Sequence, residues 1–223
     1  MLDDQVRRAM RKWPRVPAVY GWLRLGRRGQ WFLVDRGREG FDEALHGEGS
    51  PITSPPILDF IGRNYEADDQ GAWYWQNGPQ RAYVALDLAP LVLRVLGEPP
   101  TQRLVTHTGW LVERVRRAAC DLDGNLFLQT ELGPAAVDDR DIGQLELHET
   151  GTEGGLGLVL HLYPPPGTAG GAWPVEPLGV RGARPIGEAL GYVAVPVPGS
   201  DPVPGSVPGT GSAPSGSTTP PEP

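Results

Sequence analysis

Cysteine and long apolar runs are almost absent from this chain of 223 residues. The single cysteine, Cys120, has no second thiol with which to form a disulfide inside the chain. No run approaches the roughly 20 apolar residues that a membrane-spanning helix requires. The N-terminus also lacks the continuous apolar stretch of a secretory signal. These absences predict a cytoplasmic protein that does not enter a membrane.

The residue spacings of common catalytic and metal sites are absent as well. The four histidines stand far apart and accompany one cysteine, so no zinc-ligand spacing arises. The chain has no Gly-x-Ser-x-Gly motif and no complete phosphate-binding glycine loop. His148 stands beside Glu146 and Glu149, and we interpret this cluster as solvated charge at the end of a helix. We expect no cofactor and no metal, and a binding protein rather than an enzyme.

Acidic residues outnumber basic ones, so the net charge is −7. The basic residues are nevertheless concentrated near the N-terminus. This acidic balance makes nucleic-acid binding an unfavoured function, because phosphate backbones attract clustered cations. Residues 1–17 are expected to form a basic helix or arm. Two interpretations stay open for the basic residues between 7 and 28: a solvated helix face, or a surface that binds an anionic partner. That partner is either another protein or the chain's own acidic cluster at residues 138–141.

Short strands separated by turn residues dominate residues 18–163. Residues 53–67 begin with Ser54 as a candidate N-cap, followed by prolines and an apolar helical face. This alternation predicts an α+β fold with small, mainly antiparallel sheets, each with a packed helix. The clearest strand candidates are rich in Val, Tyr, Trp and Leu and cover residues 18–25, 29–35, 71–77, 80–87 and 90–96.

The same order of elements, a turn glycine, an aromatic strand, a loop and a short helix, recurs later in the chain. Gly29 corresponds to Gly124 and Phe32 to Phe127, each pair combining a turn glycine with an aromatic strand residue. We therefore expect two related subdomains, at residues 18–97 and 98–163. Beyond residue 163 the chain is rich in Pro, Gly, Ser and Thr. A partly ordered strap is expected at residues 164–195 and a disordered tail at 196–223.

Three consecutive aromatics stand out in the stretch QGAWYWQNGPQRAYVALD, residues 70–87. A strand points its side chains alternately to two faces, so one large aromatic should face water, a ligand or a partner. In one interpretation Asn77 and Gly78 form a hairpin turn, the tryptophans pack on the helix, and Tyr74 is exposed. In the other, these residues form one wall of an interdomain cleft in which arginine binds phosphate and Trp75 stacks on a base. The predicted ligand-binding residues are Arg63, Asn64, Trp75, Gln76, Asn77, Arg81, His107 and Arg140.

Four motifs between residues 20 and 150 resemble those of uncharacterised proteobacterial domain-of-unknown-function families. They are Gly-x-Trp-Phe at 29–32, Pro-Ile before a helix at 51–52, Asp-x-x-Gly at 68–71 and Asp-x-Ala-Pro at 87–90. The insert GREGFDEALHGEG, residues 37–49, departs from the pattern. The resemblance implies a two-domain α+β ligand-binding or regulatory module, with a small anionic or nucleotide-like ligand between the domains and a role in signalling. The alternatives are an enzyme with an unrecognised site and a protein-interaction or structural module.

Overall fold

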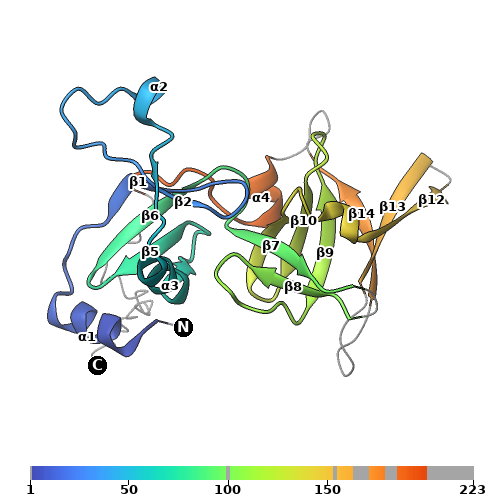
Figure 1. Ribbon diagram of the computed structural model, residues 1–223, viewed down its shortest axis with the longest axis horizontal. Helices are drawn as coiled ribbons and strands as arrows, with labels where there is room; N and C mark the ends of the chain where they lie inside the picture. Colours follow the sequence, from blue (N-terminus) through green and yellow to red (C-terminus); the bar gives the residue numbers. More distant parts are fainter. Residues whose placement is uncertain (1, 99–100, 153–154, 163–170, 179–184, 200–223) are drawn as a thin grey trace, which may run out of the picture.

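Two β-sheets contain most of the regular structure of this chain, and helices are few (Figure 1). The structure is a computed structural model that describes residues 2–98, 101–152, 155–162, 171–178 and 185–199. Within these residues, no helix combines the length and apolar character needed to cross a membrane. The helical segments are α1 (Asp4–Lys12), α2 (Glu43–His46), α3 (Pro55–Arg63), α4 (Ile186–Leu190) and the 3-10 turn η1 (Ile142–Gln144).

The first sheet has six strands in the order β3-β2-β1-β6-β5-β4. Neighbouring strands are antiparallel, except that β1 and β6 are parallel. Helix α3 connects β3 to β4 and packs on one face of the sheet, where Phe60 meets Trp75 edge to face. The strands are β1 (Val19–Leu25), β2 (Trp31–Leu33), β3 (Ser50–Pro51), β4 (Tyr65–Ala67), β5 (Trp73–Asn77) and β6 (Gln80–Leu86).

The second sheet has eight strands in the order β12-β13-β14-β9-β10-β11-β7-β8. The pairs β14–β9 and β11–β7 are parallel. One continuous apolar core includes residues of both sheets, such as Leu25 and Val84 in the first and Phe127 and Leu160 in the second. The strands are β7 (Leu91–Leu96), β8 (Arg103–Thr106), β9 (Val115–Cys120), β10 (Leu126–Thr130), β11 (Gly133–Val137), β12 (Glu146–Thr152), β13 (Gly155–Leu162) and β14 (Gly171–Pro177).

The strand order of the first sheet recurs in the second. The order β3-β2-β1-β6-β5-β4 has its counterpart in β11-β10-β9-β14-β13-β12. In each set the two central strands are parallel, β1 with β6 and β9 with β14. The hairpin turns also correspond: Gly29 and Gly124 have φ of 80° and 82°, and each donates its N–H to the carbonyl three residues before it. We call strands β1–β6 the first repeat and β9–β14 the second repeat. Where the first repeat has α3, the second has η1.

The five strand candidates of the sequence correspond to β1, β2, β5, β6 and β7, and α3 begins directly after Ser54. The α+β class agrees with the structure in coarse outline, since the two sheets dominate and carry few helices. The subdomain limits at 18–97 and 98–163 stay a prediction. Because β7 pairs with β11 of the second sheet, the strand pairing favours a limit between β6 and β7.

The aromatic run of β5 divides between the two faces of the first sheet. Trp73 and Trp75 lie on the α3 side, whereas Tyr74 lies on the opposite face beside Tyr83. Tyr74 was expected to be exposed in the hairpin interpretation, but only 5% of it is, because neighbouring side chains cover it.

The hairpin turn after β5 lies one residue beyond the expected position. Asn77 pairs with Gln80, so Gly78 and Pro79 are the central residues of the turn. Gly78 has φ of 59°, and proline has a fixed negative φ, which together suit a type II′ turn. A type I′ turn at this place would require positive φ at proline, which its ring forbids.

The described part of the expected strap contacts both sheets. Strand β14 lies between β13 and β9, and α4 contacts β9 through a hydrogen bond of 3.1 Å from Arg117 Nη1 to the Ala189 carbonyl. Val193 then forms a parallel bridge with Ala72 beside β5. Of the tail for which disorder was expected, residues 196–199 are described and contain no helix or strand. Residues 200–223 lie outside the described residues.

Candidate functional site: an arginine and aspartate network between the sheets

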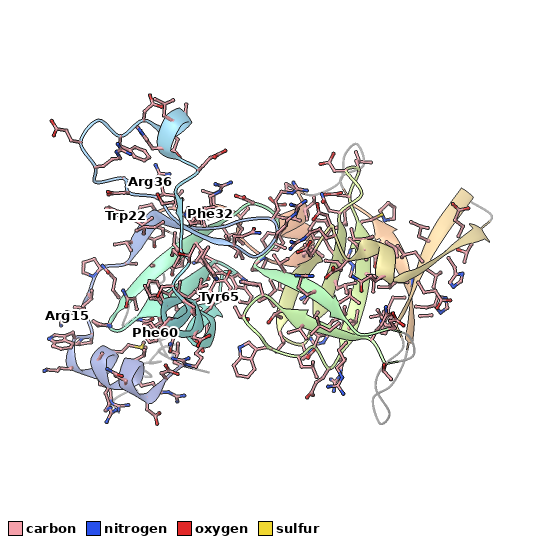
Figure 2. The ribbon with its side chains drawn as sticks, viewed as in Figure 1. Arg15, Trp22, Phe32, Arg36, Phe60 and Tyr65 are labelled. Carbon is pink, nitrogen blue, oxygen red and sulfur yellow. The ribbon has the colours of Figure 1, made fainter. Side chains whose placement is uncertain are left out.

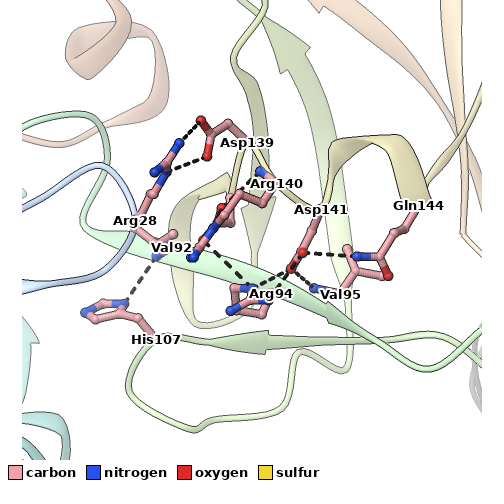
Figure 3. A network of polar contacts seen from close by, with 10 residues as sticks. Arg28, Val92, Arg94, Val95, His107, Asp139, Arg140, Asp141 and Gln144 are labelled. Atoms are coloured by element: carbon pink, nitrogen blue, oxygen red, sulfur yellow. Dashed lines mark hydrogen bonds and ion pairs between the residues drawn. The ribbon is translucent and has the colours of Figure 1, made fainter.

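The β1–β2 hairpin of the first repeat ends against the second repeat. Its tip turns back tightly because Gly29 adopts positive φ, which glycine tolerates best. Arg27 Nη2 donates to Asn125 Oδ1 at 2.7 Å. Arg28 donates through Nε and Nη2 to the two carboxylate oxygens of Asp139, each at 2.8 Å (Figure 3). Polar contacts therefore join the hairpin tip to the neighbouring sheet.

Asp138 is the first residue after β11, and it is buried with its side chain fully covered. Its backbone N–H donates to the Leu93 carbonyl, which extends the parallel pairing of β11 with β7 by one residue. Its carboxylate accepts hydrogen bonds from the backbone N–H and the Nε of Arg140, at 3.0 and 2.8 Å. This short turn fixes the Arg140 guanidinium over a buried negative charge.

Asp141 is the second buried carboxylate, and its side chain is 3% exposed. One of its oxygens accepts from Arg94 Nε at 2.5 Å and from the backbone N–H of Val95 at 3.0 Å. The other oxygen accepts from Gln144 Nε2 at 3.0 Å (Figure 3). Arg94 is carried by β7, so strand pairing and the η1 turn together set the position of this ion pair.

Two carboxylates of the network, Asp138 and Asp141, are buried, whereas its guanidiniums are about half exposed to solvent. The side chains of Arg94, Arg140 and Arg28 are 45%, 48% and 48% exposed. The hydrogen bond from Arg28 lowers the pKa of Asp139 to about 2. The hydrogen bond from Arg94 likewise lowers the pKa of Asp141, and the hydrogen bond that Arg140 donates to Asp138 raises the pKa of Arg140. Asp139, Asp141 and these arginines therefore stay ionised at neutral pH.

His107 lies beside this network, in the turn after β8 (Figure 3). Its Nδ1 accepts a hydrogen bond of 3.2 Å from the backbone N–H of Val92, and its ring contacts the rings of Trp31 and Tyr65. Burial of the ring lowers the pKa of His107 to about 3, so the imidazole is neutral at pH 7. Its Nε2 is enclosed and has no hydrogen-bond partner in the described part of the chain.

Two of the predicted site residues, Arg63 and Asn64, anchor the N-terminal segment. Asn64 is fully buried, accepts from the backbone N–H of Asp3 at 2.8 Å, and donates to the Asp3 carboxylate and the Phe60 carbonyl. Arg63 lies at the end of α3 and forms an ion pair with Asp3 at 3.3 Å. Both side chains therefore serve the attachment of α1 in this structure.

The predicted residues of the β5–β6 hairpin divide between the two faces of the sheet. Trp75 packs on Phe60 at the α3 side, and Asn77 is exposed at the end of β5. Gln76 and Arg81 are cross-strand partners on the opposite face, where the Arg81 guanidinium lies 4.5 Å from the centre of the Tyr74 ring. Gln76 is buried and donates to the Gly78 carbonyl at 2.9 Å.

Arg140 and His107 are the two predicted ligand-binding residues from the second half of the chain. Both lie at the junction of the sheets (Figure 3). Arg28 and Arg94 were not among the predicted site residues. Arg28 had a sequence signal, because binding to the acidic cluster at 138–141 was one of the interpretations left open for its basic segment. Arg94 had another, as a single charge in the apolar strand PLVLRVL.

The histidine and carboxylate cluster near residue 148 lies on a strand, not at the end of a helix as we had interpreted it. His148 belongs to β12, contacts the Glu146 carboxylate, and meets the ring of His161 on β13 at 4.9 Å. Among the described residues, no group of three or more His, Cys, Asp or Glu side chains has a geometry that could hold a metal ion. The cross-strand pairing of β12 and β13 explains why these side chains meet.

A family model that matches most of the chain supports the resemblance found in the sequence. No curated protein matches the chain at a significant level. A solved structure of a DUF1285 family protein from Silicibacter pomeroyi DSS-3 is similar, with 18% sequence identity and a TM-score of 0.46; the match covers 71% of this chain and 81% of that one. Residues 2–161 match the model of DUF2944, described as a protein of unknown function (DUF2946). The chain belongs to this family.

Proposed function

We propose that this protein is a regulatory binding module that holds a small anionic ligand at the arginine and aspartate network between its two sheets. The observation that carries the proposal is that Arg94 and Arg140 are fixed by buried carboxylates while almost half of each side chain stays exposed. Preorganised guanidiniums with free N–H groups suit phosphate and carboxylate ligands, which they bind in pairs of parallel hydrogen bonds.

Arg28 supplies the movable part of this site. Its partner Asp139 is 56% exposed, and exposed ion pairs contribute only about 0–1 kcal/mol to stability. An anion can therefore replace Asp139 at little cost, whereas Asp138 and Asp141 keep the other two arginines in place. Arg28 comes from the first repeat, whereas Arg94 and Arg140 belong to the second sheet, Arg94 on β7 and Arg140 after β11. An occupied site would therefore tighten the contact between the first repeat and the second sheet. That coupling is the basis for a regulatory role.

The described nucleophile and base candidates favour binding over catalysis. Burial raises the pKa of Cys120, which keeps it a thiol at neutral pH. His107 is neutral but enclosed, and its Nδ1 already accepts a backbone hydrogen bond. Neither side chain is poised as a nucleophile or a general base toward the open arginines.

Binding of inorganic phosphate, pyrophosphate and ADP, measured by thermal shift and calorimetry, tests the proposal. Arg28→Ala and Arg140→Lys should each weaken binding about tenfold or more, since a charge-assisted hydrogen bond contributes about 1.5–3 kcal/mol. Arg116→Ala removes an exposed arginine of β9 outside the network and serves as the matched control.

Asp139→Asn should change the anion affinity in the opposite direction. The substitution removes the negative charge that pairs with Arg28 but keeps the Arg28 guanidinium, so anion affinity should rise up to about fivefold. If none of the three anions binds, or if Arg28→Ala and Arg140→Lys bind as the wild type does, the proposed site is wrong.

A second candidate function is protein binding through the basic helix α1. Its buried contact is Val6, while Arg8, Arg11 and Lys12 are exposed and Lys12 Nζ lies 4.4 Å from the centre of the Trp13 ring. Half of Trp13 is exposed, so cation and aromatic surface are offered together. Salt-dependent binding of a poly-glutamate peptide, lost in an Arg8→Glu, Arg11→Glu variant and kept in Arg116→Glu, would support this function.

A further inference from the structure

The segment between β2 and β3 stands away from the first sheet as an arm (Figure 1). We call residues 37–49, which include α2, the acidic arm, because they contain four acidic residues and one arginine. Its contacts are largely internal. Arg36, at its base, donates through both Nη atoms to the Glu43 carboxylate and lies 5.3 Å from the centre of the Phe41 ring. Asp42 caps the first turn of α2, so the arm has a defined conformation.

The acidic arm buries almost nothing against its own chain. Helix α2 has no buried residue, and its Leu45 is 77% exposed. The carboxylate residues Glu39 and Glu48 are exposed as well. Ordering a segment costs conformational entropy, which contacts must offset. An ordered arm that covers none of its own apolar surface is therefore expected to gain contacts from a partner.

Helix α1 and the residues that follow it offer the complementary surface. Residues 5–17 contain five basic residues and no acidic one. The exposed members of this set are Arg8, Arg11, Lys12 and Arg15. Each surface also presents one large apolar side chain, Leu45 on the acidic arm and Trp13 after α1. Opposite charges that surround apolar groups favour the pairing of these two surfaces over pairing of either with itself.

The two surfaces lie at the same end of the molecule but do not meet within one chain. Figure 1 shows α1 and α2 at the end opposite to β12 and β13, with β1 and β6 between them. Figure 2 shows Arg15 and Arg36 on the two sides of that end. Helix α1 adjoins the β5–β6 turn, since a Cβ at Gly78 would lie 4.0 Å from the Ala9 Cβ. Two chains related by a two-fold axis at this end can therefore place the arm of each against α1 of the other.

We propose that two copies of this chain form a symmetric dimer in which the acidic arm of each copy binds helix α1 of the other. The proposal rests on the second candidate function above, protein binding through α1, and names its partner. A two-fold arrangement is closed, so it uses both surfaces of both chains and makes the same contact twice. Each contact is small, but the second one forms within the complex at a high effective concentration.

Sedimentation equilibrium of the full chain tests the dimer. The wild type should be a dimer in about 50 mM salt and should dissociate about tenfold or more readily in about 500 mM salt, because exposed charges are screened. Two charge reversals should each weaken the dimer to a similar extent: Glu39→Lys with Glu48→Lys on the arm, and Arg8→Glu with Arg11→Glu on α1. The matched control reverses two exposed charges of the second sheet, Glu98→Lys with Arg116→Glu, and should dimerise as the wild type does.

Mixing the two reversed variants is the decisive measurement. The arm variant has a basic arm and a basic α1, whereas the α1 variant has an acidic arm and an acidic α1. Each variant repels itself, but a pair of one chain of each kind has opposite charges at both contacts. An equimolar mixture should therefore recover the dimer that neither variant forms alone. Leu45→Ser should weaken the wild-type dimer without a change of charge.

A wild type that stays monomeric in low salt would overturn the proposal. So would a dimer that both reversals leave intact, a mixture that stays monomeric, or growth beyond the dimer. If a monomeric chain still binds poly-glutamate through α1, the second candidate function stands and its partner is a different protein. All substituted side chains are exposed, and thermal unfolding followed by circular dichroism verifies that each variant keeps its fold.

Discussion

At the scale of single residues, the junction of the sheets contains a histidine that is neutral because it is buried. The folded-state pKa of His107 is about 3, below its ordinary value near 6.5. Between these values the unfolded chain binds a proton that the folded chain does not, so the free energy of unfolding rises with pH. The stabilising effect is complete above pH 6.5 and is lost as the pH falls toward 3.

We therefore expect the stability of the protein to fall between pH 7 and pH 5 by up to about 1.4 kcal/mol for each pH unit below 6.5. This window lies above the range in which Asp139 and Asp141 take up protons, since their pKa values are lowered. Urea unfolding at several pH values measures the slope. His107→Gln should flatten it, and a slope equal to that of the wild type would contradict the explanation.

Gly29 and Gly124 provide a matched test of close packing. Both have positive φ, but a Cβ at Gly29 would lie 2.6 Å from the His107 Cβ, whereas a Cβ at Gly124 meets nothing within 4 Å. Gly124→Ala should cost about 1–2 kcal/mol for the left-handed backbone alone. Gly29→Ala adds a steric clash and should cost clearly more in thermal or urea unfolding. Equal losses would show that the hairpin tip moves freely away from His107.

At the scale of elements, helix α1 depends on a few contacts with the end of α3. One fully buried amide, Asn64, accepts from the Asp3 backbone and donates to the Asp3 side chain. Val6 adds one buried apolar side chain, while Arg8, Arg11 and Lys12 are exposed. The sequence-based prediction of a basic N-terminal helix agrees with this element, but no local pattern indicated Asn64 as its anchor.

Asn64→Ala should release α1 and cost about 1–3 kcal/mol, because it removes the partners of buried polar groups. Since α1 is rich in arginine, its release should be visible as faster trypsin cleavage within residues 7–15 under native conditions. Asn77→Ala changes an exposed asparagine at the end of β5 and serves as the control, which should leave the cleavage rate unchanged. Unaltered cleavage in Asn64→Ala would show that α1 is held by other contacts.

At the scale of the whole molecule, the repeated strand order does not produce two separate cores. Buried residues of both sheets belong to one apolar cluster, and Arg27 and Arg28 add polar contacts across the junction. A shared core couples the stability of the repeats, because opening one repeat exposes apolar surface of the other.

Native-state hydrogen exchange should therefore give one common opening free energy for the most protected amides of both repeats. Val84 in β6 and Phe127 in β10 are suitable probes, since both are fully buried. Calorimetry should show a single transition whose calorimetric and van't Hoff enthalpies agree. Two transitions, or a difference of several kcal/mol between these amides, would instead indicate independent subdomains.

The sequence alone determined the elements whose causes are local. Alternation of Val, Tyr, Trp and Leu between turn residues predicted five strands, and Ser54 with the following prolines predicted the start of α3. Gly29 and Gly124 were correctly identified as corresponding turn residues, because positive φ is a property of a single residue. These rules involve side chains only a few positions apart.

Which of these elements contact one another depends on the packing of the whole chain. Arg28 and Asp139 are 111 residues apart, and Arg94 and Asp141 are 47 apart, so no local pattern relates them. The insertion of β14 between β13 and β9, and the burial of His107 against Trp31, likewise depend on strand pairing across the chain. Such contacts are selected by the free energy of packing the whole core, which is not written in any short segment of the sequence.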